Sequence, residues 1–270
     1  MNPKLIYDVG MHNGADSDFY LKKGFDVVGI EANPALAAHC EKKFANEIAS
    51  GQLKVVNRAV AETSGVIDFY LVDDNDLWGT ADPEWKERSE KLGISSRVIQ
   101  VKSDRMEEII AEYGVPYYMK IDIEGYDHLC LMGLDGMADK PKHVSIESSA
   151  TSLRATMAQL ELRKKLGYTK FKMILQNDVH SQKCPFPARE GAYVDYQFSA
   201  STSGLFGDEL PGAWLNYYQT VDAYKLFYRK VAVIGPHTGM FRNIKNNLAK
   251  RVLYRLFHPG AGWYDTHATY

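Results

Sequence analysis

A chain of 270 residues is long enough for one large α/β domain with additions or for two small domains. The composition, 45% hydrophobic and 24% charged, is that of an ordinary globular protein, and the formal net charge of −2 gives no electrostatic reason to expect nucleic acid as a partner. The three cysteines lack metal-ligand spacing, which favours reduced thiols and a cytoplasmic location. Strand-like sequence begins at residue 4, so we expect no signal peptide, and no apolar run reaches the ~20 residues that span a membrane.

The first unit of the chain, residues 4–34, is predicted to fold as a strand, a glycine turn, a helix and a second strand. One apolar run ends at Asp8, glycines follow at Gly10 and Gly14, and a second apolar run ends at Glu31. Glycines at such a turn let the backbone approach a ligand, and a carboxylate after the second strand can accept hydrogen bonds from both hydroxyls of a ribose. The pattern indicates a nucleoside-containing cofactor; the alternative is that the glycines serve only tight packing.

The same turn lacks two common nucleotide-binding motifs. It contains neither the three glycines of G-x-G-x-x-G nor the Gly-Lys-Ser/Thr of a phosphate-binding loop. A polar turn with few glycines suits a cofactor whose charged part is an amino acid, so we predict S-adenosylmethionine, with its ribose on Glu31. The predicted cofactor-binding residues are Asp8, Gly10, His12, Gly14, Glu31, Ala32, Asp122 and Glu124.

Strand and helix signals alternate through residue 150, which is typical of a parallel sheet with helices on both faces. The predicted strands are 4–8, 26–30, 53–57, 66–72, 97–101, 117–122 and 143–147. The predicted helices are 15–23, 34–49, 104–113 and 126–132. Residues 73–96 are predicted to be a polar insertion with a short helix.

Beyond residue 150 the pattern is less regular, and the predicted elements are a helix at 151–166, a strand at 169–175 and helices at 213–230 and 241–257. Residues 176–212 are irregular but rich in aromatic side chains, which favours an ordered lid or substrate wall over disorder. We therefore expect residues 1–175 to form a cofactor-binding core. Residues 176–270 are expected to be an irregular and helical part that completes the sheet and covers the acceptor site.

Residues 117–125, YYMKIDIEG, form a second segment that is typical of an active site. Lys120, Asp122 and Glu124 alternate with apolar residues on a predicted strand that runs into a glycine turn. Ligands of open parallel sheets bind outside the carboxyl ends of the strands, and ionisable groups are costly to bury there without a partner or a function. The alternative is an ion pair between Lys120 and Asp122 with only a structural role.

Four segments in this order resemble FkbM-family S-adenosylmethionine-dependent methyltransferases: DVGMHNG, VVGIEANP, VVNRAVAETSGVIDFYL and MKIDIEGYDHLCLMGL. The resemblance covers roughly residues 4–150, and Met119–Gly125 is its most specific part. It implies an α/β fold with a Rossmann-like, seven-stranded class I methyltransferase sheet, helices on both faces and a C-terminal extension. It also implies O-methylation of a sugar, a glycan or a related natural product. His12 and Asp127 depart from the family pattern, which leaves their local contacts open.

Methyl transfer from a sulfonium to oxygen is an in-line displacement, and a base that removes the hydroxyl proton typically adds ~10²–10⁴-fold to the rate. Asp122 is the first choice for this base or for a metal ligand, and Glu147 could share the site from the neighbouring strand. Two carboxylates with His180 or His267 would suit Mg²⁺ or Mn²⁺. Of these residues, Asp122, Glu147 and His180 are the candidate metal site. The candidate catalytic residues are Asp122, Lys120, Glu147, His180 and His267.

Two other functions stay open at this point. The first is a nucleoside-binding or sensor module without turnover, in which the carboxylates only hold a ligand. The second is a dehydrogenase, which the absent third glycine disfavours.

Residues 241–257 are predicted to form an amphipathic helix, because apolar residues recur at three- and four-residue steps among five basic ones, with no acidic residue. The basic face is either solvated or contacts an anionic partner such as a lipid-linked sugar or a membrane surface. The tail WYDTHA would then fold back to the active site, where Trp263 or Tyr264 stacks on a sugar and Asp265 or His267 hydrogen-bonds it. We expect removal of residues 259–270 to leave cofactor affinity nearly intact while lowering methyl transfer. The other expected partner is a small-molecule or glycan acceptor, and the sequence specifies no oligomeric state.

Overall fold

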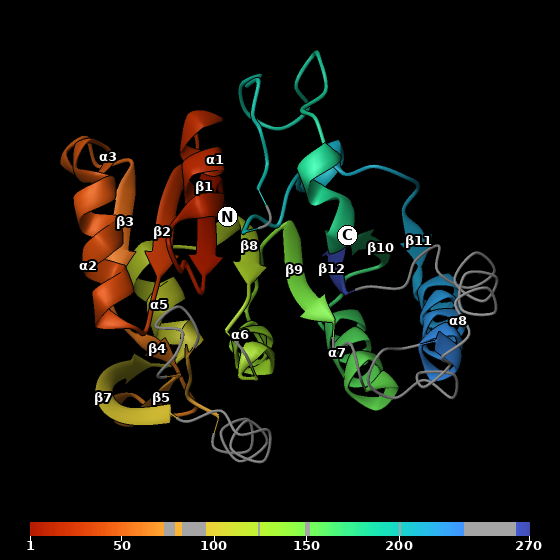
Figure 1. The fold of residues 1–270 in the computed structure, drawn as a ribbon, viewed down its shortest axis with the longest axis horizontal. Helices are drawn as coiled ribbons and strands as arrows, with labels where there is room; N and C mark the ends of the chain where they lie inside the picture. Colours follow the sequence, from red (N-terminus) through yellow and green to blue (C-terminus); the bar gives the residue numbers. More distant parts are fainter. Residues whose placement is uncertain (73–78, 83–95, 124, 149–151, 200, 235–262) are drawn as a thin grey trace, which may run out of the picture.

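The structure, a computed structural model, describes residues 1–72, 79–82, 96–123, 125–148, 152–199, 201–234 and 263–270. Its central sheet is built from β1 (Asn2–Val9), β2 (Asp26–Ile30), β3 (Leu53–Val56), β8 (Pro116–Ile121), β9 (His143–Ser148), β10 (Lys170–Leu175), β11 (Leu215–Asn216) and β12 (Tyr264–Thr269). The strand order is β11-β10-β12-β9-β8-β1-β2-β3 (Figure 1). Strands β3, β2, β1, β8 and β9 pair in parallel, and β12 pairs antiparallel to both β9 and β10.

Helices cover both faces of this sheet (Figure 1). One face carries α1 (Ala15–Lys22), α2 (Pro34–Lys43) and α3 (Ala45–Ala49), and the other carries α5 (Met106–Tyr113), α6 (Asp127–Met132), α7 (Leu153–Lys165) and α8 (Tyr217–Ile234). Successive side chains of β1 enter different clusters, Ile6 on the first face and Tyr7 on the second, because side chains of a strand alternate. Burial on both faces explains why the predicted strands read as continuous apolar runs.

The sheet differs from the expected one in strand number and membership. It has eight strands and not seven, because the two-residue strand β11 pairs with β10 at the edge. The predicted strands 66–72 and 97–101 do not join it. They form β5 (Gly65–Val72) and β7 (Ser96–Asp104) of a second sheet, with β4 (Ala59–Val60) and β6 (Gly79–Thr80), in the order β4-β7-β5-β6.

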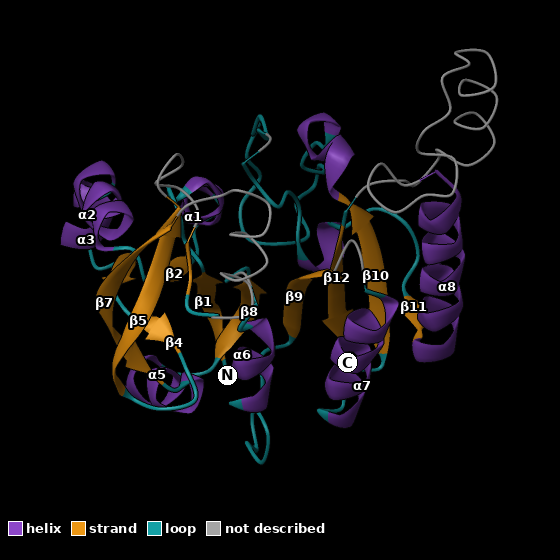
Figure 2. Ribbon diagram, turned by 60° about the horizontal axis from the view of Figure 1, so that its bottom comes forward, coloured by secondary structure: helices purple, strands orange, loops and turns teal. Residues whose placement is uncertain are grey.

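The second sheet stands beside the central one (Figure 2). β5 and β7 pair antiparallel from Gly65↔Ser103 to Val72↔Ser96, and much of β7 is exposed. One solvated face is typical of antiparallel sheets and not of a buried parallel sheet. The alternation of charged and apolar residues in this region therefore indicates a separate sheet with one solvated face. The prediction of one continuous parallel sheet was wrong for these two strands.

The C-terminal residues form an interior strand. β12 lies between β9 and β10, and five of its six residues are buried although its sequence, YDTHAT, is mostly polar. No strand was predicted for residues 263–268, which were expected to fold back toward the active site; in the structure they do so as part of the central sheet. The predicted basic helix 241–257 lies outside the described residues, as does most of the predicted insertion 73–96.

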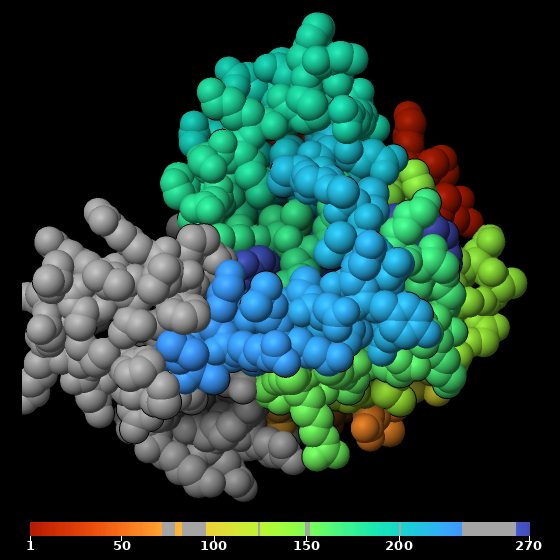
Figure 3. Space-filling model, turned by 90° about the vertical axis from the view of Figure 1, so that its right-hand side faces the viewer, coloured from red at the N-terminus to blue at the C-terminus, as the bar shows by residue number. Residues whose placement is uncertain are grey.

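The edge of the molecule near β11 is formed by two segments that follow β10. Figure 3 shows α8 crossing this face, with residues between 176 and 215 above it. This segment starts with the 3₁₀ helix η1 (Gln176–Ser181), and its residues Phe198, Leu205 and Phe206 are buried against α1. Within the described ranges, no helix has both the length and the apolar character to cross a membrane.

Candidate active site

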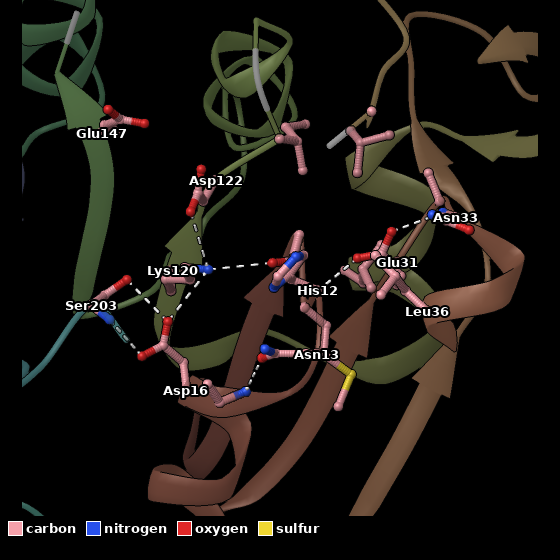
Figure 4. A pocket seen from close by; sticks show the side chains of 18 of the residues that line it. His12, Asn13, Asp16, Glu31, Asn33, Leu36, Lys120, Asp122, Glu147 and Ser203 are labelled. Carbon is pink, nitrogen blue, oxygen red and sulfur yellow. Dashed lines mark hydrogen bonds and ion pairs between the residues drawn. The ribbon is translucent and has the colours of Figure 1, made fainter. Parts of the chain in front are cut away.

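A cavity of about 360 Å³ lies at the carboxyl ends of β1, β2, β8 and β9 (Figure 4). This is the edge where open parallel sheets bind ligands, and the volume is that of a small-molecule site. The wall runs from Glu31 and Leu36 on the β2 side, past Lys120 and Asp122, to Glu147 on β9. Residues of the second sheet and of the segment after β10 also line it, among them Phe69, Gly79, Gln176 and Ser203.

The turn after β1 fixes Glu31 at the cavity wall. The backbone N–H groups of His12 and Asn33 donate to the two carboxylate oxygens of Glu31, at 2.7 and 2.8 Å. His12 adopts φ 53, an uncommon left-handed conformation for a residue with a side chain. Burial raises the pKa of Glu31, while the two backbone hydrogen bonds act in the opposite direction. A carboxylate has about four lone-pair positions, so about two of them can still accept hydroxyls of a ligand.

The two glycines of the turn are required by packing. Gly10 has φ +80, and a Cβ there would lie 1.9 Å from the carbonyl oxygen of Asp122. Gly14 has φ +72, and a Cβ there would lie 2.4 Å from the ring of Phe44. Gly10 lines the cavity, whereas Gly14 is not among the lining residues. Gly14 therefore fits the packing alternative, and Gly10 lets the β1 turn touch the end of β8.

Lys120 is the centre of the charged network beneath the cavity. Its ammonium lies 3.4–3.5 Å from carboxylate oxygens of Asp8, Asp16 and Asp122, and it donates to the carbonyl of Gly10 at 3.3 Å. Burial alone would lower the pKa of Lys120, but the carboxylates raise it well above its ordinary value. A permanently charged ammonium cannot act as a base, so Lys120 positions its carboxylate partners.

Asp8 lies below the cavity and does not line it. Its side chain is fully buried, accepts a hydrogen bond from Ser17 at 2.7 Å and pairs with Lys120. A contact with the cofactor was predicted for Asp8. The geometry instead gives it the role of holding Lys120.

Asp16 is a site residue that the sequence did not reveal. It lines the cavity, lies near Lys120 and accepts hydrogen bonds from the backbone N–H and hydroxyl of Ser203, at 2.7 and 3.0 Å (Figure 4). Burial raises the pKa of Asp16 to about 6, although Lys120 acts against this. In the sequence, Asp16 is an acidic residue in the first turn of a predicted helix. Its charge interacts favourably with the helix dipole there, so no further role was expected from the sequence.

Three carboxylates border the end of the cavity farthest from Glu31. Asp122 follows β8, Glu147 is on β9, and Asp265 is on β12 directly opposite Glu147 in the strand register. Asp265 is buried, and burial together with the charge of Asp122 raises its pKa well above its ordinary value. Trp263 also lines the cavity and is 46% exposed.

The sequence of the chain matches the family model of the methyltransferase FkbM domain over residues 8–173. The chain belongs to this family. No curated protein matches it.

Three solved structures illustrate how distant the structural relatives are. The FkbM methyltransferase from Methylobacillus flagellatus KT is 15% identical with a TM-score of 0.40, and the match covers 63% of this chain and 39% of that one. An S-adenosylmethionine-dependent methyltransferase from Archaeoglobus fulgidus is 11% identical (TM-score 0.42; 100% and 87% covered). A third, from Thiobacillus denitrificans in complex with S-adenosyl-L-homocysteine, is 9% identical (TM-score 0.37; 98% and 84% covered). These similarities are too low to transfer a substrate or the role of a residue.

The two departures from the FkbM pattern have clear local contacts. His12 donates its backbone N–H to Glu31, and burial lowers the pKa of its imidazole. Asp127 accepts hydrogen bonds from the backbone N–H groups of Ile123 and Gly125, at 3.0 and 3.3 Å. Asp127 therefore holds the turn that follows β8 and carries Asp122.

Of the other residues that the sequence predicted for the site, only some lie at the cavity. Ala32 lines the cavity, and Glu124 lies outside the described residues. His180 is exposed on η1 and does not line the cavity, although Gln176 of the same turn does. His267 shares a strand face with Asp265 but lies two residues further from the cavity, where it is buried. Tyr264 faces the opposite side and packs on Phe227.

The predicted metal trio does not come together at the cavity of this FkbM-family chain. Asp122 and Glu147 line the cavity, but His180 does not. In the described part of the chain, the one set of three His, Cys, Asp or Glu side chains close enough to share an ion lies elsewhere. We therefore assign no metal to the cavity.

Proposed function

We propose that this protein is an S-adenosylmethionine-dependent O-methyltransferase that acts on a hydroxyl of a sugar, a glycan or a related natural product. One observation carries the proposal. A single cavity joins a hydrogen-bonded carboxylate at the end of β2, Glu31, to three carboxylates at its other end, Asp122, Glu147 and Asp265.

The β2 side of the cavity suits the nucleoside of the cofactor. Glu31 would accept the ribose hydroxyls, and the apolar side chains of Leu36, Val60 and Phe69 would contact the flat base. Asp16, whose carboxylate also faces the cavity, would pair with the ammonium of an amino acid. S-adenosylmethionine, when bound, would supply a methyl group attached to a positively charged sulfur.

The other end of the cavity suits a polyhydroxylated acceptor. Gln176 and Ser203 add neutral hydrogen-bonding groups to the three carboxylates, and the half-exposed ring of Trp263 offers an apolar face. Asp122 would accept the proton of the acceptor hydroxyl as its oxygen attacks the methyl carbon. The cofactor would supply the methyl group for this attack, and its sulfur would keep the electron pair of the carbon–sulfur bond. Lys120 holds the Asp122 carboxylate in place through their ion pair at 3.5 Å.

The proposal is tested by measuring methyl transfer to hydroxyl-bearing acceptors alongside cofactor affinity. Asp122→Asn should lower kcat by about 10²–10⁴-fold, the usual contribution of a general base, and leave cofactor affinity within about threefold. Asp135→Asn, an exposed aspartate paired with Lys165 away from the cavity, is the matched control and should change neither quantity.

Two outcomes would contradict the proposal. Full activity of Asp122→Asn would remove Asp122 from the reaction. Tight binding of S-adenosylmethionine without transfer to any of a broad set of sugars and hydroxylated natural products would instead support the non-catalytic nucleoside-binding module.

A further inference from the structure

A second group of ionisable side chains lies at the opposite end of the central strands. His143 is the first residue of β9, whereas Glu147 at the cavity is near its last. Glu190 and Asp208 come from the segment that follows η1. One ligand atom from each of these three residues lies within 4.8 Å of the other two.

The side chain of His143 is buried, and one of its two ring nitrogens makes no hydrogen bond to the described residues. It is 1% exposed, and within the described ranges its Nδ1 has no hydrogen-bond partner. Its Nε2 points into the group, 3.9 Å from a Glu190 oxygen and 3.2 Å from the Tyr117 hydroxyl. Nε2 is therefore the ring nitrogen that a metal ion held by this group would meet.

The two carboxylates differ in how firmly their neighbours hold them. Glu190 is buried and accepts hydrogen bonds from the Tyr117 hydroxyl, at 2.9 and 3.1 Å, and from the backbone N–H of Asp208 at 2.7 Å. Carboxylates that bind metal ions are usually held in position by hydrogen bonds of this kind from neighbouring groups. Asp208 is half exposed, which leaves a path to solvent.

One cation already approaches this group from the outside. The ammonium of Lys142 lies 3.5 Å from Asp208 and 3.2 Å from the Tyr117 hydroxyl. Its side chain is 41% exposed, so it can turn into water without leaving a buried charge. Two carboxylates beside an imidazole thus attract positive charge, and a divalent ion would satisfy them better than an ammonium at 3.5 Å.

We propose that His143, Glu190 and Asp208 form a site for a divalent transition-metal ion of the Zn²⁺ class. One nitrogen and two oxygen ligands suit Zn²⁺, Mn²⁺, Co²⁺ or Ni²⁺, and are less suited to Mg²⁺ or Ca²⁺, which prefer oxygen alone. The ion ties the segment that carries Glu190 and Asp208 to the amino end of β9. Ser203 lies between Glu190 and Asp208 in the sequence and lines the cavity. The ion would therefore also stabilise the part of the cavity wall that Ser203 forms.

Titration of the purified full-length protein with Zn²⁺ and Co²⁺ tests this site without reference to activity. Calorimetry should find one equivalent of Zn²⁺ per chain, with a rise in Tm. The indole of Trp214 stacks on His143 with ring centroids 6.2 Å apart, so Co²⁺ should quench its fluorescence. Trp214→Phe should remove that quenching and keep Zn²⁺ binding.

Asp208→Asn is the decisive variant, because a half-exposed side chain can change without disturbing the core. Removing a group that only orients a metal ligand lowers metal affinity by about 10–100-fold. Removing a ligand itself should therefore weaken Zn²⁺ binding by at least about tenfold. His143→Gln should do the same. The matched controls are Asp222→Asn, an exposed aspartate on α8, and His39→Gln, an exposed histidine on α2. Equal Zn²⁺ affinity in Asp208→Asn and the unaltered protein, or the same loss in the controls, would overturn the proposal.

Discussion

Lys120 and His267 are both buried polar side chains, but they differ in whether their polar atoms are satisfied. Lys120 has three carboxylates and a carbonyl around its ammonium. Both ring nitrogens of His267 lack a hydrogen-bond partner within the described ranges. Burial, with His143, Arg163 and Lys172 nearby, lowers the pKa of His267 to about 3. His267 is therefore a neutral core residue in this fold, and its predicted catalytic role has no geometric support.

The burial of His267 predicts a loss of stability in mild acid. Its pKa is lower in the folded state than the ordinary 6.5, so protonation favours unfolding, and the stabilisation present above pH 6.5 is lost as the pH falls toward 3. Between pH 6.5 and 5 this amounts to about 2 kcal/mol. Urea unfolding should show that His267→Phe loses about 2 kcal/mol less than the unaltered protein over this interval. His143 acts in the same direction and remains in the variant.

Gly10 and Gly24 allow the cost of a steric contact to be separated from the cost of a left-handed backbone. Their φ values are +80 and +85, but a Cβ at Gly10 would overlap the backbone of Asp122. Among the described residues, apart from the chain neighbours, a Cβ at Gly24 would meet no atom within 4 Å. Gly24→Ala should therefore cost about 1–2 kcal/mol of unfolding free energy. Gly10→Ala should cost at least about 2 kcal/mol more, because β1 and β8 must move apart. Similar losses in the two variants, measured by urea unfolding, would show that the turn can relax.

At the scale of the elements, β12 shows how tertiary contacts can place a polar sequence inside a sheet. Its backbone groups are satisfied by pairing with β9 and β10 on both sides. Arg163 of α7 donates to the carbonyl of Thr266 at 2.8 Å, and the hydroxyl of Thr266 contacts those of Ser148 and Tyr224. Odd-numbered residues share one face of the strand, and Asp265, the first of them in β12, lines the cavity. One strand thus provides both a structural pairing and a cavity carboxylate.

This position reverses the expected effect of shortening the chain. Removing residues 263–270 takes away an interior strand and leaves β9 and β10 without a partner between them. We now expect the shortened protein to lose its cooperative unfolding transition, and with it cofactor binding. Removal of Tyr270 alone, which follows the last residue of β12, is the control and should be tolerated. Circular dichroism during heating measures both, and a cooperative transition in the eight-residue deletion would contradict the role given to β12.

At the scale of the whole molecule, the cavity joins parts that lie far apart in the chain. Asp16 and Ser203 are hydrogen-bonded across 187 positions, and both the second sheet and the central sheet, including its strand β12, supply lining residues. A ligand that fills such a cavity binds only the folded chain, so it should stabilise the molecule as a unit.

S-adenosylhomocysteine, the product form of the proposed cofactor, should therefore raise the free energy of unfolding. At a concentration 100 times its Kd, the expected gain is about 2.7 kcal/mol. Glu31→Gln removes the charge that should accept the ribose hydroxyls, a loss of about 1.5–3 kcal/mol of binding energy, and should abolish most of the gain at the same concentration. Glu161→Gln, an exposed glutamate on α7, is the control. Unfolding measured with and without the ligand would contradict the prediction if Glu31→Gln kept the full gain.

Local sequence signals were enough to predict most strands of the central sheet. Apolar runs identified β1, β2, β8, β9 and β10, because strands buried on both faces carry such runs. The motif of Met119–Gly125 and the turn after Asp8 identified the FkbM family, and Glu31, Asp122 and Glu147 were correctly expected at one edge of the sheet, since parallel strands bring their carboxyl ends together.

Other features of the fold and of the cavity depend on contacts between segments that are distant in the sequence, and local signals did not reveal them. The tertiary structure separated β5 and β7 into a second sheet, placed the polar strand β12 in the interior, and brought Asp16 and Asp265 to the cavity while leaving Asp8 beneath it and His180 outside it. The physical reason is the same in each case. A polar residue has the same local signal whether it faces water, an ion pair or a cavity, and only the packing of the other segments settles which of these surrounds it.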